Sequence, residues 1–415
     1  MPSPSTYPTS KQLLLPFLDL MNQGATSAAA IYDKLADEFN LTPLLKEKTV
    51  LSNISYWRRK CRWVMQDLKQ KGFILQHERN HWNLTEEGKT FLQNAKPGVV
   101  ITVFTTPKGE SIWAECQHAL TNIKDDSVQL CFTSPPYDLI TPKEYGNLSG
   151  KYYIDWLADI CCQIKRTLKP DGSLVLNLGN TYLPGIPEQS LYQERLMIKL
   201  CDEMGFSLAQ RLFWYKTTAL PGPTKWASKD RVRVKDSLET LWWLGKSPNV
   251  YANNAEVLKE YADSHKRLMA KANQKGIDKS IRTRKPGGLT VSEGIYSNNG
   301  GAIPDNIILP DLEISPDNII VFPNNYSWDA NYAKECEKYN LLPHPARFPK
   351  KLPEFFIKFL TKPGDTILDP FSGSNITGQV AESLNRQWIA IEKSFHYIKT
   401  SIFRFNQVSI NPIFR

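Results

Sequence analysis

The 415-residue chain lacks the spacings by which cysteines bind metals or form redox pairs. Its seven cysteines include no CxxC pair, which argues against a zinc site and against a disulfide framework. No apolar run approaches the length of about 18 residues that a membrane span needs. Residues 1 to 10 have neither the charge nor the apolar run of a signal peptide. We therefore expect a soluble, cytoplasmic protein that neither enters a membrane nor binds a metal.

The chain also lacks the usual signatures of phosphate-binding loops. There is no GxGxxG and no Walker lysine, so we expect no pyrophosphate site. The charge excess is small: 51 Lys and Arg against 42 Asp and Glu give a net charge of +9, which fits an anionic partner without proving one. The length allows roughly two or three domains, and 41% hydrophobic residues supply a core.

An apolar run at residues 128 to 132 ends abruptly at Ser134-Pro135-Pro136-Tyr137. Two consecutive prolines cannot continue a strand ladder, and Pro136 biases Pro135 towards an extended backbone. The hydroxyl of Ser134, the carbonyl of Pro135 and the ring of Tyr137 should therefore lie at the carboxyl end of a buried strand. In open α/β sheets, ligands bind at that edge.

Such an edge suits a planar ring that carries an exocyclic amine. The amine of cytosine or adenine is a poor nucleophile because its lone pair is delocalised into the ring. Two acceptors on its hydrogens, the Ser134 hydroxyl and the Pro135 carbonyl, would free the lone pair for in-line attack on a methyl donor. Tyr137 would stack on the ring. A buried strand followed by an ordinary proline turn is the alternative interpretation of this motif by itself.

Residues 10 to 95 have a pattern of their own. Three segments carry apolar residues at helical spacing, and a short hairpin follows between residues 73 and 85. The third segment holds Trp57 and Leu68 inward and Arg58, Arg59 and Arg62 outward. Three helices and a two-stranded wing predict a winged helix, a variant of the helix-turn-helix. The alternative is a solvated basic face on a unit that only docks on the rest of the chain.

After a linker predicted at residues 96 to 110, strands and helices alternate. Strands are expected at 111–115, as an edge strand, and at 128–132, 174–178, 212–215 and 238–244, with a helix over 152–168. This alternation predicts crossover units and a mostly parallel sheet. The loop before the last of these strands gathers cations around Trp226, and we expect them to bind DNA: Lys225, Lys229, Arg231, Arg233 and Lys235.

From residue 247 to about residue 340 the periodicity fails and the composition becomes polar and basic. A long irregular segment inside a compact domain is usually functional or disordered. The functional interpretation is a clamp on DNA phosphates that includes Arg282, Arg284 and Lys285, with a few side chains at base edges. A solvated insert is the alternative.

Residues 365 to 392 have the order of a strand, a glycine-bearing turn, a helix and a second strand that Glu392 closes. A turn of small residues lets a ligand approach the backbone, and the closing acid takes ribose hydroxyls. Because the pyrophosphate signatures are absent, an adenosine that carries an amino acid fits better. The alternative is a structural crossover with Glu392 at the surface.

Two motifs together match a known family. Thr133 to Tyr137, followed far downstream by Asp369-Pro370-Phe371-Ser372-Gly373-Ser374, resembles the S-adenosylmethionine-dependent amino-methyltransferases of DNA. The order, with the catalytic half first, is similar to that of the permuted N4-cytosine enzymes of bacterial type II restriction-modification systems. The likeness spans roughly residues 111 to 405. Residues 57 to 72 and 82 to 88 resemble the amino-terminal domain of Mrr-type restriction proteins.

The resemblance implies a Rossmann-like methyltransferase fold of the α/β class, with an N-terminal winged helix and an irregular DNA-recognition insert. It implies S-adenosylmethionine as the cofactor and Ser134, Pro135, Pro136 and Tyr137 as catalytic residues. The implied cofactor site comprises Glu115, Phe348, Pro349, Asp369, Pro370, Phe371, Gly373, Ser374, Asn375, Thr377 and Glu392. At the first of these positions the family often has Gly-Asp where this chain has Ala114-Glu115, so the implied adenine contact falls on Glu115 in place of the family's aspartate.

The sequence thus predicts an enzyme that flips a cytosine from double-stranded DNA and methylates its N4 amine, which protects the site from a cognate restriction endonuclease. Serine at the first motif position favours cytosine, because the adenine enzymes usually carry aspartate or asparagine there. N6-adenine methylation, a glutamine or RNA methyltransferase, and a non-catalytic DNA-binding regulator stay open as alternatives. A monomer is the default expectation. The expected divisions are a winged helix (1–97), a catalytic half (98–246), a target-recognition insert (247–340) and a cofactor half (341–415).

Overall fold

The computed structural model describes residues 7–8, 10–22, 24–39, 41–47, 49–50, 54–78, 80–92, 98–136, 151–183, 185–216, 223–272, 282–284, 289–291, 297–308, 330–339 and 341–411. Tyr137 and Lys285 lie outside these residues, and of Arg282 and Arg284 only the backbone is described. In the described part of the chain, no helix is long and apolar enough to cross a membrane.

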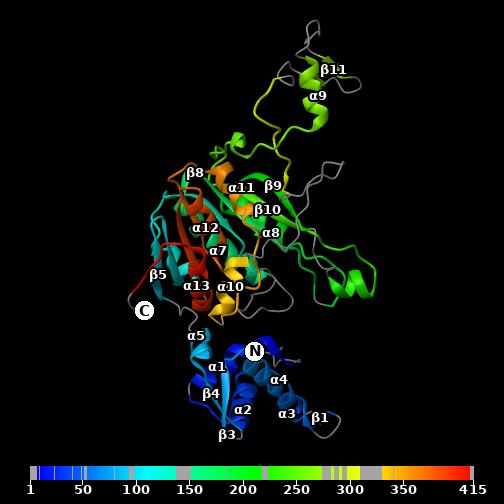
Figure 1. The fold of residues 1–415 in the computed structure, drawn as a ribbon. Coiled ribbons are helices and arrows are strands. Elements are labelled where there is room, and N and C mark those ends of the chain that lie inside the picture. Colours follow the sequence, from blue (N-terminus) through cyan, green and yellow to red (C-terminus); the bar gives the residue numbers. More distant parts are fainter. Residues whose placement is uncertain are drawn as a thin grey trace.

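The N-terminal unit, blue in Figure 1, is built from helices packed around one apolar cluster. Its elements are α1 (Ser10–Asn22), α2 (Ala28–Glu38), α3 (Pro43–Glu47), α4 (Tyr56–Gln70), the hairpin of β3 (Ile74–Glu78) and β4 (His81–Leu84), and α5 (Glu86–Leu92). The three helices and the hairpin predicted from the sequence are present. The sequence did not predict α3, α5 or the ribbon of β1 (Thr49–Val50) and β2 (Ile54–Ser55).

The longest helix described in this unit is α4, and its sequence explains how it is placed. The Ser55 side chain caps it by accepting a hydrogen bond from the Arg58 amide at 3.4 Å. Its apolar face buries residues that include Trp57, whose indole N–H donates to the Tyr32 carbonyl at 2.8 Å. The polar face carries Arg58 and other exposed residues, so the amphipathic pattern fixes which side of α4 faces the core.

A ten-stranded sheet forms the body of the molecule. Its order is β13-β9-β10-β8-β7-β14-β15-β6-β5-β16. The run from β8 to β6 is parallel throughout, while β9 and β10 on one side and β5 and β16 on the other pair antiparallel with their inner neighbours. The strands are β5 (Val100–Thr106), β6 (Gly109–Ala114), β7 (Val128–Thr133), β8 (Leu168–Leu178), β9 (Ser207–Tyr215), β10 (Leu238–Gly245), β13 (Ile307–Ile308), β14 (Thr366–Asp369), β15 (Gln387–Glu392) and β16 (Ser409–Ile410). The predicted mostly parallel α/β sheet is confirmed.

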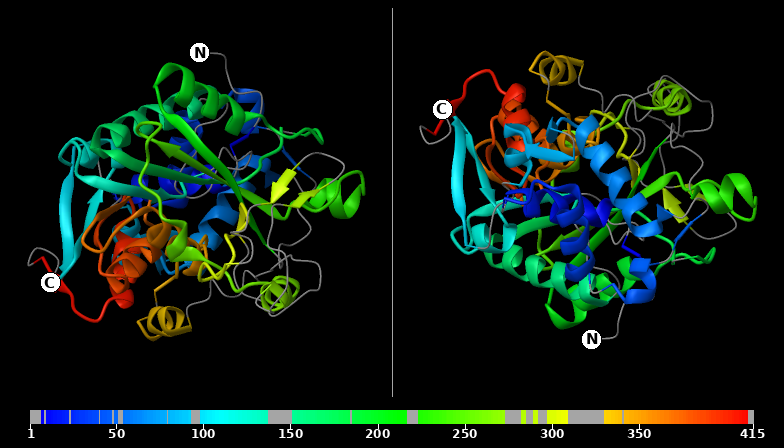
Figure 2. Two further views of the ribbon diagram at one scale, coloured as in Figure 1. Left: turned by 90° about the horizontal axis from the view of Figure 1, so that it is seen from above. Right: turned by 90° about the horizontal axis from the view of Figure 1, so that it is seen from below.

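Helices cover both faces of this sheet (Figure 2). One apolar cluster packs α6 (Cys116–Leu120), α7 (Lys151–Thr167) and α8 (Tyr192–Ile198) against one face. A second cluster packs α11 (Lys351–Leu360), α12 (Ile376–Ser383) and α13 (Phe395–Ser401) against the other. Every residue of β7 is buried because that strand is covered on both sides, as its mostly apolar composition predicted.

The adjacent strands β7 and β14 form the topological switch point of the sheet. The chain passes from β7 to β8 through α7 on one face, and from β14 to β15 through α12 on the other. Loops that leave neighbouring strands in opposite directions open a crevice at the carboxyl edge, where open α/β sheets bind ligands. Both chemical motifs of the sequence end in this crevice, since Ser134 follows β7 and Pro370 follows β14.

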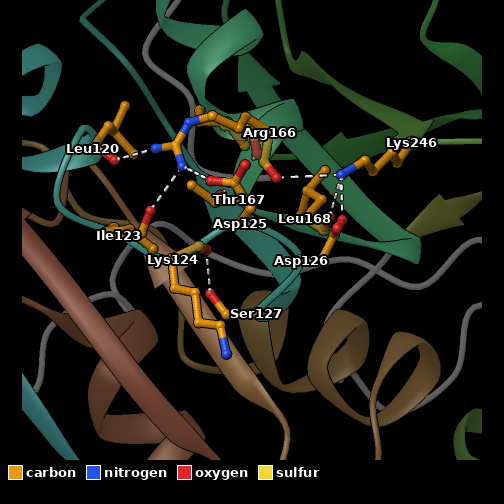
Figure 3. A network of polar contacts seen from close by, with 11 residues as sticks. Leu120, Ile123, Lys124, Asp125, Asp126, Ser127, Arg166, Thr167, Leu168 and Lys246 are labelled. Carbon is orange, nitrogen blue, oxygen red and sulfur yellow. Dashed lines mark hydrogen bonds and ion pairs between the residues drawn. The ribbon is translucent and has the colours of Figure 1, made fainter.

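The opposite end of β7 is held by a polar network, drawn in Figure 3. The Arg166 guanidinium at the end of α7 pairs with Asp125 and donates to the Leu120 carbonyl at 2.6 Å. Lys246, just after β10, pairs with Asp126 at 2.6 Å and donates to the Leu168 carbonyl at 2.7 Å. These contacts join α6, α7, β8 and β10 around the turn that starts β7, so they fix the strand whose other end carries the first motif.

The prediction of a linker at residues 96 to 110 is wrong for most of its length. Val100–Thr106 is β5, which pairs antiparallel with β6. Consequently β6 lies inside the sheet between β15 and β5, and the prediction of an edge strand at residues 111 to 115 is also wrong. Pro107 and Lys108 form the turn between β5 and β6, and Gly109 begins β6 at a position where a Cβ would stand 2.3 Å from the Trp388 ring.

The prediction that regular structure fails from residue 247 to 340 is wrong in part. The described residues there include the 3-10 turn Asn254–Val257, α9 (Asp263–Ala272), the ribbon of β11 (Arg282–Arg284) and β12 (Leu289–Val291), the sheet strand β13, and α10 (Ala330–Lys338). These elements are too short to leave a periodicity in the sequence. Figure 1 shows α9 and β11 projecting from the body, whereas α10 is anchored to it by the Tyr332 hydroxyl, 3.0 Å from Thr400 Oγ1.

Candidate active site

A cavity of about 780 Å³ opens at the carboxyl ends of β7, β14 and β15. Its volume lies within the range of sites for small organic ligands. The loops after β7 and β14 contribute its wall, together with residues 344–348, the helix α7, and the ends of β8, β9, β10 and β15. The cavity therefore coincides with the switch-point crevice that the topology creates.

One part of the cavity is formed by the turn after β14 and the end of β15. Gly373 has a φ of +50°, and its amide donates to Glu392 Oε2 at 2.9 Å. The other carboxylate oxygen of Glu392 accepts from the Ser394 amide at 2.8 Å. A Cβ on Gly373 would stand 3.0 Å from the His344 ring, so the absence of a side chain keeps the turn close to residues 344–348. The arrangement presents an anchored carboxylate beside bare backbone.

Aromatic rings line the same cavity as this carboxylate. The Phe348 ring packs edge-on against Phe132 of β7 with centroids 5.4 Å apart. The Phe371 ring lies 5.8 Å from the ring of Trp156 in α7. Phe348, Phe371 and Trp156 all line the cavity, so a planar ligand beside Glu392 would meet apolar surface.

Asp369 ties the two motif strands together from inside the protein. Its Oδ1 accepts from the Thr133 hydroxyl of β7 at 2.7 Å, and its Oδ2 accepts from the Thr377 hydroxyl of α12 at 2.7 Å. The Phe371 amide also donates to Oδ1, at 3.2 Å. One carboxylate thereby sets the position of β7, β14, α12 and the intervening turn relative to one another.

Burial raises the pKa values of both carboxylates. The pKa of Glu392 is raised to about 7, although the Ser394 and Gly373 amides favour its charged form. The pKa of Asp369 is raised to about 6, although the hydroxyls of Thr133 and Thr377 oppose the shift. Glu392 is therefore poised to change its protonation near neutral pH when a ligand changes its surroundings.

On the other side of β7, polar side chains from three strands meet near Ser134. The Ser134 hydroxyl donates to the Asn177 carbonyl of β8 at 3.3 Å. The Asn177 side chain donates to Glu239 Oε2 of β10 at 3.0 Å, and Glu239 also pairs with Lys216. No role was predicted from the sequence for Asn177, Lys216 or Glu239. The available signals were Asn177 as the one polar residue of strand 174–178 and Glu239 as the one charged residue of strand 238–244, because buried polar groups need partners.

The structure brings most of the predicted site residues to one cavity. Its lining includes the predicted residues Glu115, Ser134, Pro135, Pro136, Phe348, Pro370, Phe371, Gly373, Ser374 and Glu392. Four other predicted cofactor residues are buried and do not line it: Pro349, Asp369, Asn375 and Thr377. Asn375 instead caps α12 by accepting from the Gly378 amide at 3.0 Å. Tyr137 lies outside the described residues.

The predicted DNA-binding cations of residues 225–235 lie outside the cavity on an exposed segment after β9. Residues Thr224–Lys229 form one π-helical turn, in which the Lys225 ammonium stands 4.0 Å from the centre of the Trp226 ring. Arg233 donates to the Pro187 carbonyl at 2.6 Å. All five cations of the segment are exposed: Lys225, Lys229, Arg231, Arg233 and Lys235.

Comparisons with known proteins agree with this geometry. A family model described as DNA methylase matches residues 128–403, and one described as the Mrr N-terminal domain matches residues 11–94. The type II methyltransferase M.PvuII of Proteus hauseri is 37% identical over 312 residues, which cover 75% of this chain and 88% of that protein. The DNA adenine methyltransferase YhdJ of Escherichia coli is 25% identical over 70% of this chain and 80% of its own length. A solved structure, the PvuII DNA methyltransferase (cytosine-N4-specific), matches with a TM-score of 0.54 at 33% identity and covers 72% of this chain and 87% of that one.

Proposed function

The chain belongs to the DNA methylase family and carries an Mrr N-terminal domain, and we propose that it transfers a methyl group from S-adenosylmethionine to the N4 amine of cytosine in double-stranded DNA. The observation that carries the proposal is the single cavity shared by the Ser134–Pro136 segment and the turn after β14. The first supplies acceptors for an amine and the second a site for a nucleoside. The more similar relative is named as a cytosine-N4 enzyme, whereas the adenine enzyme is more distant, so N6-adenine methylation is the weaker alternative.

The described residues fit S-adenosylmethionine. Glu392 presents a carboxylate that can accept both ribose hydroxyls, next to the turn at Gly373 where no side chain blocks a ligand. Phe348 and Phe371 offer apolar surface for the rest of the molecule. When bound, S-adenosylmethionine supplies an electrophilic methyl group on a sulfonium. We propose that the other cavity-lining residues predicted for the cofactor, including Glu115 and Ser374, contact it. Asp369 is proposed as a positioning residue that holds the turn after β14 through its hydrogen bonds inside the protein.

The Ser134 hydroxyl and the Pro135 carbonyl would activate the target amine by hydrogen bonding, because neither group is a strong base. The Ser134 hydroxyl is oriented by its bond to the Asn177 carbonyl, and the Pro135 carbonyl is fixed by the paired prolines. Both oxygens can accept an N–H of the target amine, which localises the nitrogen lone pair for in-line attack. The proton leaves after methylation, when the nitrogen is acidic. Tyr137 is proposed to stack on the flipped base.

The cysteines near the cavity do not support methylation at the ring carbon. That reaction needs a thiolate that attacks C6 of cytosine. Cys116 lines the cavity, but burial raises the pKa of its thiol to about 12. Burial also raises the pKa of Cys131, inside β7, well above its ordinary value. Both thiols therefore stay protonated at neutral pH and are poor nucleophiles.

Methyl transfer itself tests the proposal. The full chain should incorporate a labelled methyl group from S-adenosylmethionine into duplex DNA at a subset of sites, and not into RNA or protein. Label found in RNA or protein and absent from DNA would contradict it.

We further propose that the modification protects those sites from a cognate restriction endonuclease, and that the enzyme works as a monomer in the cytoplasm. We also propose that its functional parts are residues 1–97, 98–246, 247–340 and 341–415.

Cofactor affinity should fall as the pH drops through about 7. Ribose hydroxyls donate to the charged form of Glu392, whose pKa in the free protein is raised to about 7. Below that pH the carboxyl group must lose a proton before it can accept both hydroxyls, so the dissociation constant should rise by up to about tenfold per pH unit. Calorimetry at pH 6 and pH 8, in buffers of different ionisation enthalpy, should detect the released proton. The Glu392→Gln variant should bind more weakly and without this pH dependence, and a proton release that persists in it would assign the effect to another group.

The exposed cations of residues 225–235 should bind DNA phosphates. Charge reversal at Arg231 and Lys235 should lower the slope of log affinity against log salt by about 0.9 for each phosphate that the protein no longer neutralises. A matched control reverses two exposed cations at the opposite edge of the sheet: Lys124 in the turn before β7 and Lys362 in the turn before β14. Equal slopes for the two double variants would show that the segment faces solvent. We propose that Lys225, Lys229, Arg233, Arg282, Arg284 and Lys285 belong to the same interface.

A further inference from the structure

The part of the cavity formed by β8, β9 and β10 carries polar side chains that have no role in the amine activation proposed above. Trp214 near the end of β9 and Lys216 just after it line the cavity together with Glu239 of β10 and Asn177 of β8. In the sheet order, these strands lie on the side of β7 away from β14 and β15. The group is therefore separate from the Glu392 carboxylate and adjacent to Ser134.

Lys216 is held in place by a chain of contacts that starts at the first motif. The Ser134 hydroxyl is bonded to the Asn177 carbonyl, and the Asn177 amide donates to one oxygen of Glu239. The other oxygen of Glu239 pairs with the Lys216 ammonium. The side chains of Lys216 and Glu239 are only 21% and 10% exposed, so this is a largely desolvated ion pair beside the amine site. An ammonium has three N–H donors, and the carboxylate of Glu239 can occupy only part of them.

Trp214 supplies a second donor at the same place. It is 5% exposed, and its indole N–H is buried without a hydrogen-bond partner among the described residues. The Lys216 ammonium stands 5.6 Å from the centre of the Trp214 ring, so the two donors are neighbours. A buried donor without an acceptor is costly. Because Trp214 is also one of the residues that line the cavity, a ligand there is the candidate acceptor.

We propose that Lys216 and Trp214 recognise the N3 and O2 atoms of the flipped cytosine, with Glu239 as the positioning residue for Lys216. This inference rests on the proposed function. N4, N3 and O2 lie along one edge of cytosine, and once Ser134 and Pro135 hold the amine, the two atoms that follow are both acceptors. Adenine presents N1 beside its amine but a C–H where cytosine has O2. An adenine in this cavity would leave one buried donor without an acceptor, so the pair selects cytosine against adenine.

The test removes O2 from the substrate and the donors from the protein. The substrate is a duplex in which the mapped target cytosine is replaced by a 2-aminopyridine C-nucleoside, which keeps the amine and the ring nitrogen but has a C–H in place of the carbonyl. The specificity constant and the duplex affinity are measured with both substrates for the full chain, for Lys216→Met and for Trp214→Phe. For the unaltered protein, the specificity constant should be about 10²-fold lower with the O2-free base than with cytosine. For at least one of the two variants, the specificity constant should be the same with both bases.

Two additional measurements keep the outcome clear. Because Lys216→Met removes the cation that pairs with the Glu239 carboxylate, the double variant Lys216→Met with Glu239→Gln removes both charges and is tested in parallel. Binding of S-adenosylmethionine, which depends on β14 and β15, reports whether each variant is folded. If all the proteins lose the same factor with the O2-free base, the inference is overturned while the methylation of cytosine stands. If the unaltered protein places no methyl group on cytosine N4, the proposed function fails, and this inference fails with it.

Discussion

Replacement of Ser134 by alanine is expected to lower the turnover number by about 10²-fold or more, with almost no change in the affinity for S-adenosylmethionine. Ser134 follows the buried strand β7, and its hydroxyl is oriented by the Asn177 carbonyl 3.3 Å away. Its oxygen is proposed to accept an N–H of the target amine, an interaction that strengthens as the nitrogen becomes tetrahedral. Most of the residues proposed to hold the cofactor lie in the turn after β14 and at the end of β15, so cofactor binding should not sense the change.

Single-turnover methylation and calorimetric cofactor binding would separate the two effects. A matched control is Ser127→Ala at the opposite end of the same strand, where the hydroxyl donates to the Lys124 carbonyl at 2.7 Å and lies far from the cavity. That variant should methylate at the normal rate. A Ser134→Ala enzyme that keeps full turnover would show that the amine is activated by other groups.

Replacement of Asp369 by alanine is expected to weaken cofactor binding by about 10²-fold and to lower the free energy of unfolding by about 3 kcal/mol. The carboxylate accepts hydrogen bonds from the hydroxyls of Thr133 and Thr377 and from the Phe371 amide. Without it, these buried donors lose their acceptor, and β7, α12 and the turn after β14 lose their common anchor. The turn carries Gly373, so the cofactor site should be displaced with it.

Titration with S-adenosylmethionine and thermal unfolding measure the two losses. The Asp369→Asn variant is the conservative control, since it keeps an oxygen for Thr133 and Phe371 and nearly the same volume, and its losses should be smaller. If Asp369→Ala and Ser134→Ala weakened cofactor binding equally, the proposed separation between an amine end and a cofactor end would be wrong.

The sequence predicts those parts of the site where strand-ending residues, prolines or a glycine turn, follow a buried strand. The paired prolines stop β7 at Ser134, and the small turn with its closing acid identifies Gly373 and Glu392. The motifs predict which residues belong to the site, but not whether each side chain faces the cavity or the protein interior. The same passage that placed Asp369 among the cofactor residues could not show that its carboxylate faces Thr133 inside the protein, because this depends on the pairing of β14 with β7.

The Lys216, Glu239 and Asn177 cluster could not be predicted for a related reason. Each residue is a polar position in or next to a mostly apolar strand, and only the sheet order β9-β10-β8 brings them together. That order depends on long-range pairing, which leaves no local pattern in the sequence. β5 was missed because glycines and prolines on either side of Val100–Thr106 suggested a linker, whereas Gly109 is required by its packing against Trp388.

The position of the transferred methyl group tests the central claim most directly. Plasmid DNA from cells that express the full chain should be digested to nucleosides and compared by mass spectrometry with standards of the three methylated bases. We predict N4-methylcytosine, which disappears when Ser134 is replaced by alanine. N6-methyladenine as the sole product would contradict the assignment of the target base and leave the fold standing. 5-Methylcytosine would contradict the mechanism itself, because the thiols of Cys116 and Cys131 are held protonated by burial.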